Sequence, residues 1–272
     1  MLRAINGCAT ITVRPLRWAA AFRPYHSYDH LNFDDELKSL NQSSLKHQIL
    51  SDTINNSIKN YGITSAAVDS SMNSFVRSNE RFQNKSSNIG VIFDDDKDVE
   101  LVNHYLEQTR ISLQKDIETE EFKKLPTEIS KLKFLMFKRI QSNINLMANG
   151  GDNYKLHDNL RSLLALLVQP TNIPSSLEQL SKLSDDLLFY SGDQSHEFDW
   201  YEKRFKIAAI YVKTELFMLT DQSKGFTRTF RFIEDQLKLY NDVNNLVDNA
   251  QQWLVFNGFS LINLIKSQLS RG

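Results

Sequence analysis

The sequence predicts an all-α protein, and three observations lead to this fold class. Glycine and proline are scarce, with 9 and 5 copies in 272 residues. Apolar residues recur three and four positions apart along most of the chain, a spacing that places them on one face of a helix. No segment alternates apolar and polar residues for long enough to indicate a β-strand. We therefore expect a helical bundle with a helix-turn-helix-like head before it and an amphipathic helix after it.

Residues 1–28 have the composition of a mitochondrial transit peptide. They contain no lysine and no acidic residue, and the first carboxylate of the chain is Asp29. Within "RPYHS", at 23–27, a matrix protease is expected to cut after Tyr25. A secretory signal fits less well because arginines interrupt the apolar run, and a disordered basic tail is the other alternative. The arginines are Arg3, Arg14, Arg17 and Arg23.

Residues 29–93 are expected to form the helix-turn-helix-like head from three short helical segments. The first ends at Tyr61-Gly62, the second begins at Thr64 and the third spans 78–93. Residues 44–90 contain five basic and three acidic side chains, which gives a net charge of about +2. These cations are too few and too dispersed for a DNA-binding surface. The apolar stripes are Leu45, Ile49, Ile54 and Ile58, then Ala67, Val68, Met72 and Phe75.

Residues 94–248 are expected to form a bundle of longer helices at 95–120, 126–148, 154–168, 197–220 and 226–247. A further helix is expected to begin within "NIPSSLEQL", where Ser175 and Glu178 have the spacing of a capping box just before the stripe Leu177, Leu180, Leu183 and Leu187. The helix at 126–148 follows Pro126 and ends at Asn149-Gly150-Gly151. Its predicted inward residues are Leu132, Leu135, Met136, Ile140, Ile144 and Met147.

Residues 249–272 are expected to contain an amphipathic helix, at 250–270, that lies on a membrane surface. Its two cations are Lys266 and Arg271, so binding would depend on apolar insertion more than on attraction to anionic lipid. The alternatives are a buried terminal helix and a dimer contact. No stretch reaches the roughly 20 apolar residues that a membrane span needs. The predicted membrane-facing residues are Leu254, Val255, Phe259, Leu261, Ile262, Ile265 and Leu269.

The sequence carries no pattern typical of an enzyme. There is one cysteine, Cys8, and no Glu-x-x-His pair of the kind that holds a di-iron centre. Glycine-rich phosphate loops, a G-x-S-x-G elbow and H-E-x-x-H are also absent. We therefore expect no catalytic residues, no metal and no cofactor. The formal charge of −1 gives no overall field to attract nucleic acid.

The stretch 172–221 contains "GDQS", "FDWY", "AAIY" and "TEL", and with these motifs it resembles the accessory lipid-binding proteins of mitochondrial ubiquinone biosynthesis. The ending "LINLIKSQLSRG" is similar to the fungal branch. The resemblance implies a TetR-like fold, a homodimer and a bundle, 94–248, that binds a polyprenylated quinone intermediate or a phospholipid. It also implies a peripheral place on the matrix side of the inner membrane and presentation of the intermediate to the di-iron demethoxyubiquinone hydroxylase. The alternative is a TetR-type transcriptional regulator with a hydrophobic ligand.

Trp200 lies beside the apolar stripe that we expect to be the buried side of its helix. That stripe is Phe198, Tyr201, Phe205, Ala208, Val212, Leu216 and Leu219. Trp200 opens a second row with Arg204, Ile207 and Tyr211, so we expect it to be partly exposed. It could simply cover the edge of the core, but Trp, Tyr and Arg also dominate binding hot spots. The resemblance implies a hydroxylase-binding patch at Leu187, Tyr190, Trp200, Tyr201 and Arg204.

A lipid pocket is expected from the resemblance alone, because periodicity cannot distinguish a filled interior from a hollow one. The residues by themselves favour a filled core. The resemblance places the pocket walls on the inner rows of 126–148 and 197–220. Its candidate lining residues are Phe205, Ala209, Val212 and Leu216.

Overall fold

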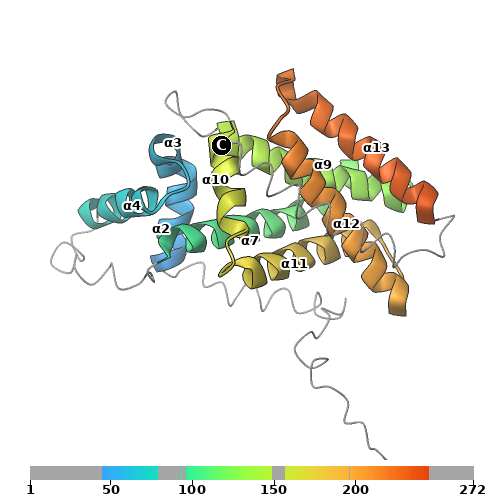
Figure 1. The fold of residues 1–272 in the computed structure, drawn as a ribbon, viewed down its shortest axis with the longest axis horizontal. Helices are drawn as coiled ribbons and strands as arrows, with labels where there is room; N and C mark the ends of the chain where they lie inside the picture. Colours follow the sequence, from blue (N-terminus) through green and yellow to red (C-terminus); the bar gives the residue numbers. More distant parts are fainter. Residues whose placement is uncertain (1–44, 79–92, 94–95, 149–156, 196, 245–272) are drawn as a thin grey trace, which may run out of the picture.

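The structure is a computed structural model that describes residues 45–78, 93, 96–148, 157–195 and 197–244. Every regular element within these ranges is a helix, as predicted. The short helices α2, α3 and α4 lie at one end of the molecule, and α12 and α13 lie towards the other (Figure 1). The expected transit peptide and the C-terminal helix, with its seven predicted membrane-facing residues, lie outside the described residues.

The head begins with α2 (Leu45–Asp52), the π-helix η3 (Thr53–Ser57) and α3 (Ile58–Tyr61). Ile49 and Ile54 are five positions apart, and the wider π turn keeps both in the core, where they are 0% and 7% exposed. The segment ends at Gly62, whose φ of 67° suits a residue without a Cβ. After the turn, α4 (Ser65–Ser78) packs back against η3. Most of the third predicted segment, 79–92, lies outside the described residues.

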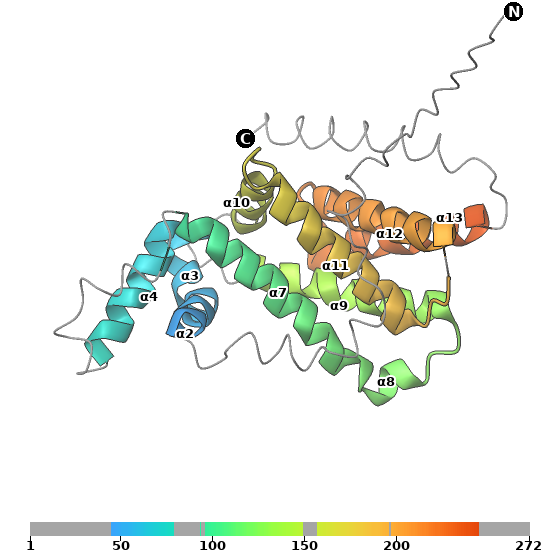
Figure 2. The same ribbon diagram turned by 90° about the horizontal axis from the view of Figure 1, so that it is seen from below.

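The long helix α7 (Lys97–Ile117) leads from the head into the bundle, and the short α8 (Glu120–Lys123) follows it. Then come α9 (Glu128–Ala148), α10 (Asp158–Leu167), α11 (Ile173–Ser191) and α12 (Glu197–Met218). The 3₁₀ turn η5 (Lys224–Phe226) precedes α13 (Thr227–Asn244). Figure 2 shows α7 and α11 running side by side, consistent with the packing between them. The five helices predicted between 95 and 247 are confirmed to within a few residues.

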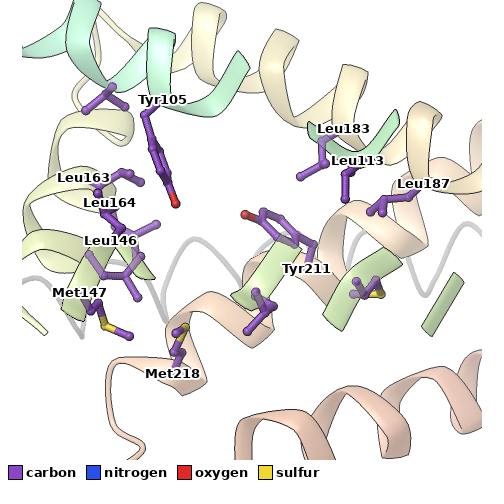
Figure 3. Close-up of a cluster of buried hydrophobic side chains, with 14 of the residues drawn as sticks. Tyr105, Leu113, Leu146, Met147, Leu163, Leu164, Leu183, Leu187, Tyr211 and Met218 are labelled. Carbon is purple, nitrogen blue, oxygen red and sulfur yellow. The ribbon is translucent and has the colours of Figure 1, made fainter. Parts of the chain in front are cut away.

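The central helix of the bundle is α9, which packs against α7, α10, α11 and α13. Its predicted inward residues Leu132, Leu135, Met136 and Ile140 are 0% exposed. Met147 is also buried, and Ile144 is partly buried against the same cluster. Figure 3 shows the part of this core where side chains from α7, α9, α10, α11 and α12 meet.

The capping box predicted at the start of α11 is wrong. The helix begins at Ile173, with Asn172 before it and Pro174 in the first turn, where a proline is tolerated because no N–H is needed there. Ser175 instead donates from Oγ to Oδ1 of Asn103, at 3.5 Å. Glu178 pairs with Lys182, one turn along the helix. The helix therefore starts earlier than a serine cap would place it.

The predicted inward face of α12 is also wrong. Tyr201 and Phe205 are 53% and 38% exposed, and of the predicted stripe Ala208, Val212 and Leu219 are only partly buried, whereas Leu216 is 4% exposed. The neighbouring row enters the core instead: Arg204, Ile207, Tyr211 and Met218 are 7%, 0%, 3% and 0% exposed. Phe198 falls outside the described side chains. Apolar residues occur all around this helix, and the polar members of the inner row find partners inside the bundle.

Candidate functional site

The surface around Trp200 depends on how the chain leaves α11. Gly192 adopts a left-handed conformation with φ of 99°, which favours glycine over residues that carry a Cβ. Its N–H donates to the carbonyl of Phe189 at 3.0 Å, and the N–H of Asp193 donates to that of Leu188 at 3.1 Å. These two bonds form a Schellman motif, which turns the chain and fixes the position of Asp193.

Asp193 is the centre of the turn between α11 and α12. Its side chain is 0% exposed and accepts a bond from Ser195 Oγ at 2.6 Å. Lys203 Nζ donates to it at 2.6 Å and Arg204 Nη1 at 3.1 Å. Burial by itself would raise the pKa of Asp193, but these bonds outweigh the burial and hold the pKa below its ordinary value. The turn is therefore fixed by a charged carboxylate at neutral pH.

Arg204 connects this turn to Trp200. It is 7% exposed, and its Nε donates to Oδ1 of Asp185 at 2.5 Å, across the α11–α12 contact. Its Nη1 also donates to the carbonyl of Trp200 at 3.2 Å. The guanidinium carbon lies 3.9 Å from the centroid of the indole ring, in cation–π contact. Trp200 itself is partly exposed, as predicted.

The structure separates the predicted hydroxylase-binding residues into two levels. Tyr201 is exposed and its ring lies 4.9 Å from that of Trp200, and Tyr190 is partly buried. Leu187 is 0% exposed, so its side chain belongs to the core. Arg204 lies beneath the surface with it. Phe205, which the periodicity predicted to be buried, is also exposed. It lies one helical turn after Tyr201, on the same side of α12.

Asp185 and Asp193 were missed by the sequence prediction. Both acids lie near aromatic residues in the sequence. Nothing in their local pattern distinguishes them from ordinary exposed polar residues. The signal that could have found them is the arginine one turn after Trp200, because a buried guanidinium needs a carboxylate partner.

The candidate lipid-pocket residues of α12 differ in their exposure. Ala209 and Leu216 are 5% and 4% exposed, Val212 is partly buried and Phe205 is exposed. A cleft of about 420 Å³ lies elsewhere, between α2 and η3 on one side and α7 and α9 on the other. It has a mixed lining that includes His47, Asn55, His104, Tyr105, Gln108 and Leu146.

The interior of the bundle contains a polar centre. Tyr105 and Tyr211 point toward one another inside the apolar cluster (Figure 3). Tyr105 donates to Oδ1 of Asn143 at 3.0 Å, and Arg139 donates to the same oxygen at 2.7 Å. Asn143 Nδ2 donates to Glu215 at 2.8 Å, and the Tyr211 hydroxyl also donates to Glu215. Burial raises the pKa of Glu215, and the positive charge of Arg139 makes this increase smaller.

The described residues contain no group of three or more histidine, cysteine, aspartate or glutamate side chains that could hold a metal ion. Within the same ranges, no helix has the length and apolar character to cross a membrane. In and near the head, Lys46 pairs with Glu100 at 2.8 Å and Lys97 pairs with Asp69 at 2.7 Å. Positive charge near the head is thus partly neutralised within the chain.

Comparison with known proteins gives one family. A family model described as COQ9 matches residues 173–244, which include the whole Trp200 surface. The chain is 46% identical over 89 residues to the human protein named "Ubiquinone biosynthesis protein COQ9, mitochondrial", a match that covers 33% of this chain and 27% of the human one. It is 31% identical over 149 residues to the Schizosaccharomyces pombe protein of the same name, covering 54% of each chain. The Saccharomyces cerevisiae protein is 32% identical over 178 residues, covering 64% of each.

Proposed function

The chain belongs to the COQ9 family of ubiquinone biosynthesis proteins, as one of its fungal members, and from this premise we propose that it is a mitochondrial accessory protein that presents a lipid substrate to an enzyme. The substrate is a polyprenylated quinone intermediate, and the enzyme is the di-iron demethoxyubiquinone hydroxylase. The chain itself performs no bond chemistry. It positions the substrate and removes it from water at the matrix side of the inner membrane, where the protein is peripherally bound as a homodimer.

The observation that carries this proposal is the aromatic surface of α12. Tyr201 and Phe205 are exposed and Trp200 is partly exposed, all within two turns of one helix. Large aromatic side chains at the centre of an interface contribute most of the binding free energy in many complexes. The ion pairs beneath them hold the surface in place before any partner arrives. A docking surface for another protein is the role that this arrangement supports best.

The lipid-binding part of the proposal rests on family membership and on the sequence of the last helix. In the helix predicted at 250–270, seven apolar residues between 254 and 269 would fall in one broad arc. Such a helix can lie in the interface of a bilayer and bring the bundle to its substrate. The described α12 residues Phe205, Ala209, Val212 and Leu216 stay candidates for contact with the prenyl chain.

The proposal is tested by titrating the hydroxylase against the purified chain and against its Trp200→Ala variant. The substitution should weaken binding by about 2 to 4 kcal/mol, roughly 30- to 900-fold in Kd. Leu239→Ala is the matched control, because Leu239 is 55% exposed on α13. It should leave the Kd unchanged, and both variants should keep the helical circular dichroism of the parent. Equal Kd values for the parent and Trp200→Ala would refute the role of this surface.

A further inference from the structure

We propose that Arg204 acts as a positioning residue and not as a partner contact: with Asp185 and Asp193 it forms a buried clamp that holds the indole of Trp200 in one orientation. The inference rests on the proposed function of the surface but concerns a different step, namely how the surface is made rigid in the free protein.

The clamp is built from three separate parts of the chain. Asp185 lies within α11, Asp193 follows the end of α11 and Arg204 lies within α12. The two carboxylates reach the guanidinium at different nitrogens, Nε at 2.5 Å and Nη1 at 3.1 Å. Arg204 therefore cannot turn without breaking at least one charge-assisted hydrogen bond.

The burial of the clamp argues against direct contact with a partner. Asp185 is 1% exposed and Arg204 is 7% exposed, and the Asp193 side chain is 0% exposed. Buried charges of this kind are costly unless they are paired, and each of these three has a paired charge. The outward member of the group is Trp200, whose ring covers the guanidinium at 3.9 Å.

The chemistry of the contact requires arginine at this position. A guanidinium is planar and donates in several fixed directions, so it can bond two carboxylates in its plane while an aromatic ring stacks on its face. A lysine ammonium keeps the charge but has no plane to offer the indole. Residues 200 and 204 are one helical turn apart, which is the spacing that brings the ring and the guanidinium together.

A fixed indole lowers the entropy that is lost when a partner binds. Immobilising one rotamer-rich side chain at an interface costs about 0.5 to 1.5 kcal/mol, so loss of the clamp should weaken hydroxylase binding by roughly 2- to 12-fold. That loss is smaller than the one expected for Trp200→Ala. It should also depend on the presence of the indole.

The test uses the full chain with Trp18→Phe and Trp253→Phe, which leaves Trp200 as its one tryptophan. Fluorescence anisotropy and acrylamide quenching of the free protein then report on this indole alone. Arg204→Lys should lower the anisotropy and increase the quenching, and Asp193→Asn should do the same if Arg204→Lys does not fold. Lys203→Met is the matched control, since Lys203 bonds Asp193 whereas the cation over the indole is Arg204.

Hydroxylase titrations with the same variants complete the test. In a double-mutant cycle, Arg204→Lys should weaken hydroxylase binding roughly 2- to 12-fold when residue 200 is tryptophan. It should cause no further loss when the chain already carries Trp200→Ala. Unchanged anisotropy and quenching in folded Arg204→Lys or Asp193→Asn would overturn the clamp, and so would additive effects in the cycle, which would make Arg204 a direct contact. If Trp200→Ala alone leaves the affinity unchanged, the proposed docking function fails, while the fluorescence of the free protein still decides the clamp.

Discussion

His104 lies where its protonation is opposed in the folded chain. It is 7% exposed on α7, its ring centroid is 4.5 Å from that of His47, and its Nε2 is 3.1 Å from Ser51 Oγ. Burial, and then the nearby His47, lower the pKa of His104 to about 4. In the unfolded chain this histidine has its ordinary pKa of 6.5. As the pH falls, the unfolded state therefore binds the proton at a higher pH than the folded state does.

This residue predicts a pH dependence of stability. The contribution of His104 to the free energy of unfolding should be fully present above pH 6.5 and should be lost as the pH decreases from 6.5 towards 4, because at this residue the unfolded state alone gains a proton in that window. Urea denaturation at pH 7.5 and 5.0 measures the effect. His104→Gln should make the difference between the two pH values smaller, and an unchanged difference in this variant would rule out His104 as its source. The lowered pKa of Asp193 acts only below its ordinary value of 3.8 and therefore outside this window.

At the scale of elements, the polar centre of the bundle joins three helices. Tyr105 comes from α7, Arg139 and Asn143 come from α9, and Tyr211 and Glu215 come from α12. Arg139 is 1% exposed, and its guanidinium carbon lies 5.7 and 5.3 Å from the ring centroids of Tyr105 and Tyr211. Burial raises the pKa of Tyr105 to about 12, so its hydroxyl stays protonated as a donor at neutral pH.

Removing the cation of this centre should destabilise the fold. Arg139→Met leaves Glu215 buried without its nearby positive charge, and the loss should be about 3 to 5 kcal/mol at pH 7. The double variant Arg139→Met/Glu215→Gln removes both charges and should recover part of that stability. Denaturation by urea compares the variants. A loss below about 1 kcal/mol for the single variant, or no recovery in the double one, would contradict this account of the centre.

The sequence predicted the existence of these helices better than the faces they bury. The six residues of the predicted α9 stripe are buried or partly buried as expected, because they are apolar and recur at helical spacing, but the burial of Arg139 and Asn143 on the same helix was not predicted. On α12 the same method failed, because Arg204, Tyr211 and Glu215 lie inside and Tyr201 and Phe205 lie outside. Hydrogen bonds to other helices determine which face of this helix is buried, and the local spacing of apolar residues does not show these bonds. The start of α11 failed similarly, since Ser175 bonds a residue of α7.

At the scale of the whole molecule, the bundle has an apolar core interrupted by paired charges, and it carries an aromatic surface above one group of them. Trp200 is partly exposed as predicted, but not for the predicted reason: the row that it opens with Arg204, Ile207 and Tyr211 is the buried one, and Trp200 lies at the end of that row. Arg204 indicates that a carboxylate partner lies nearby, but a single sequence does not show which acids of the chain meet it, so Asp185 and Asp193 were not identified. The cleft between the head and α7 was likewise beyond prediction, since it depends on how two units of the fold are placed against each other.

The most direct test of the central claim is a turnover measurement with the purified hydroxylase and a demethoxylated polyprenyl quinone carried in liposomes. The chain should increase the rate of hydroxylation, Leu239→Ala should retain the increase and Trp200→Ala should lose most of it. A rate that is the same with and without the chain, under conditions where the quinone reaches the membrane, would contradict the claim that this protein presents the substrate.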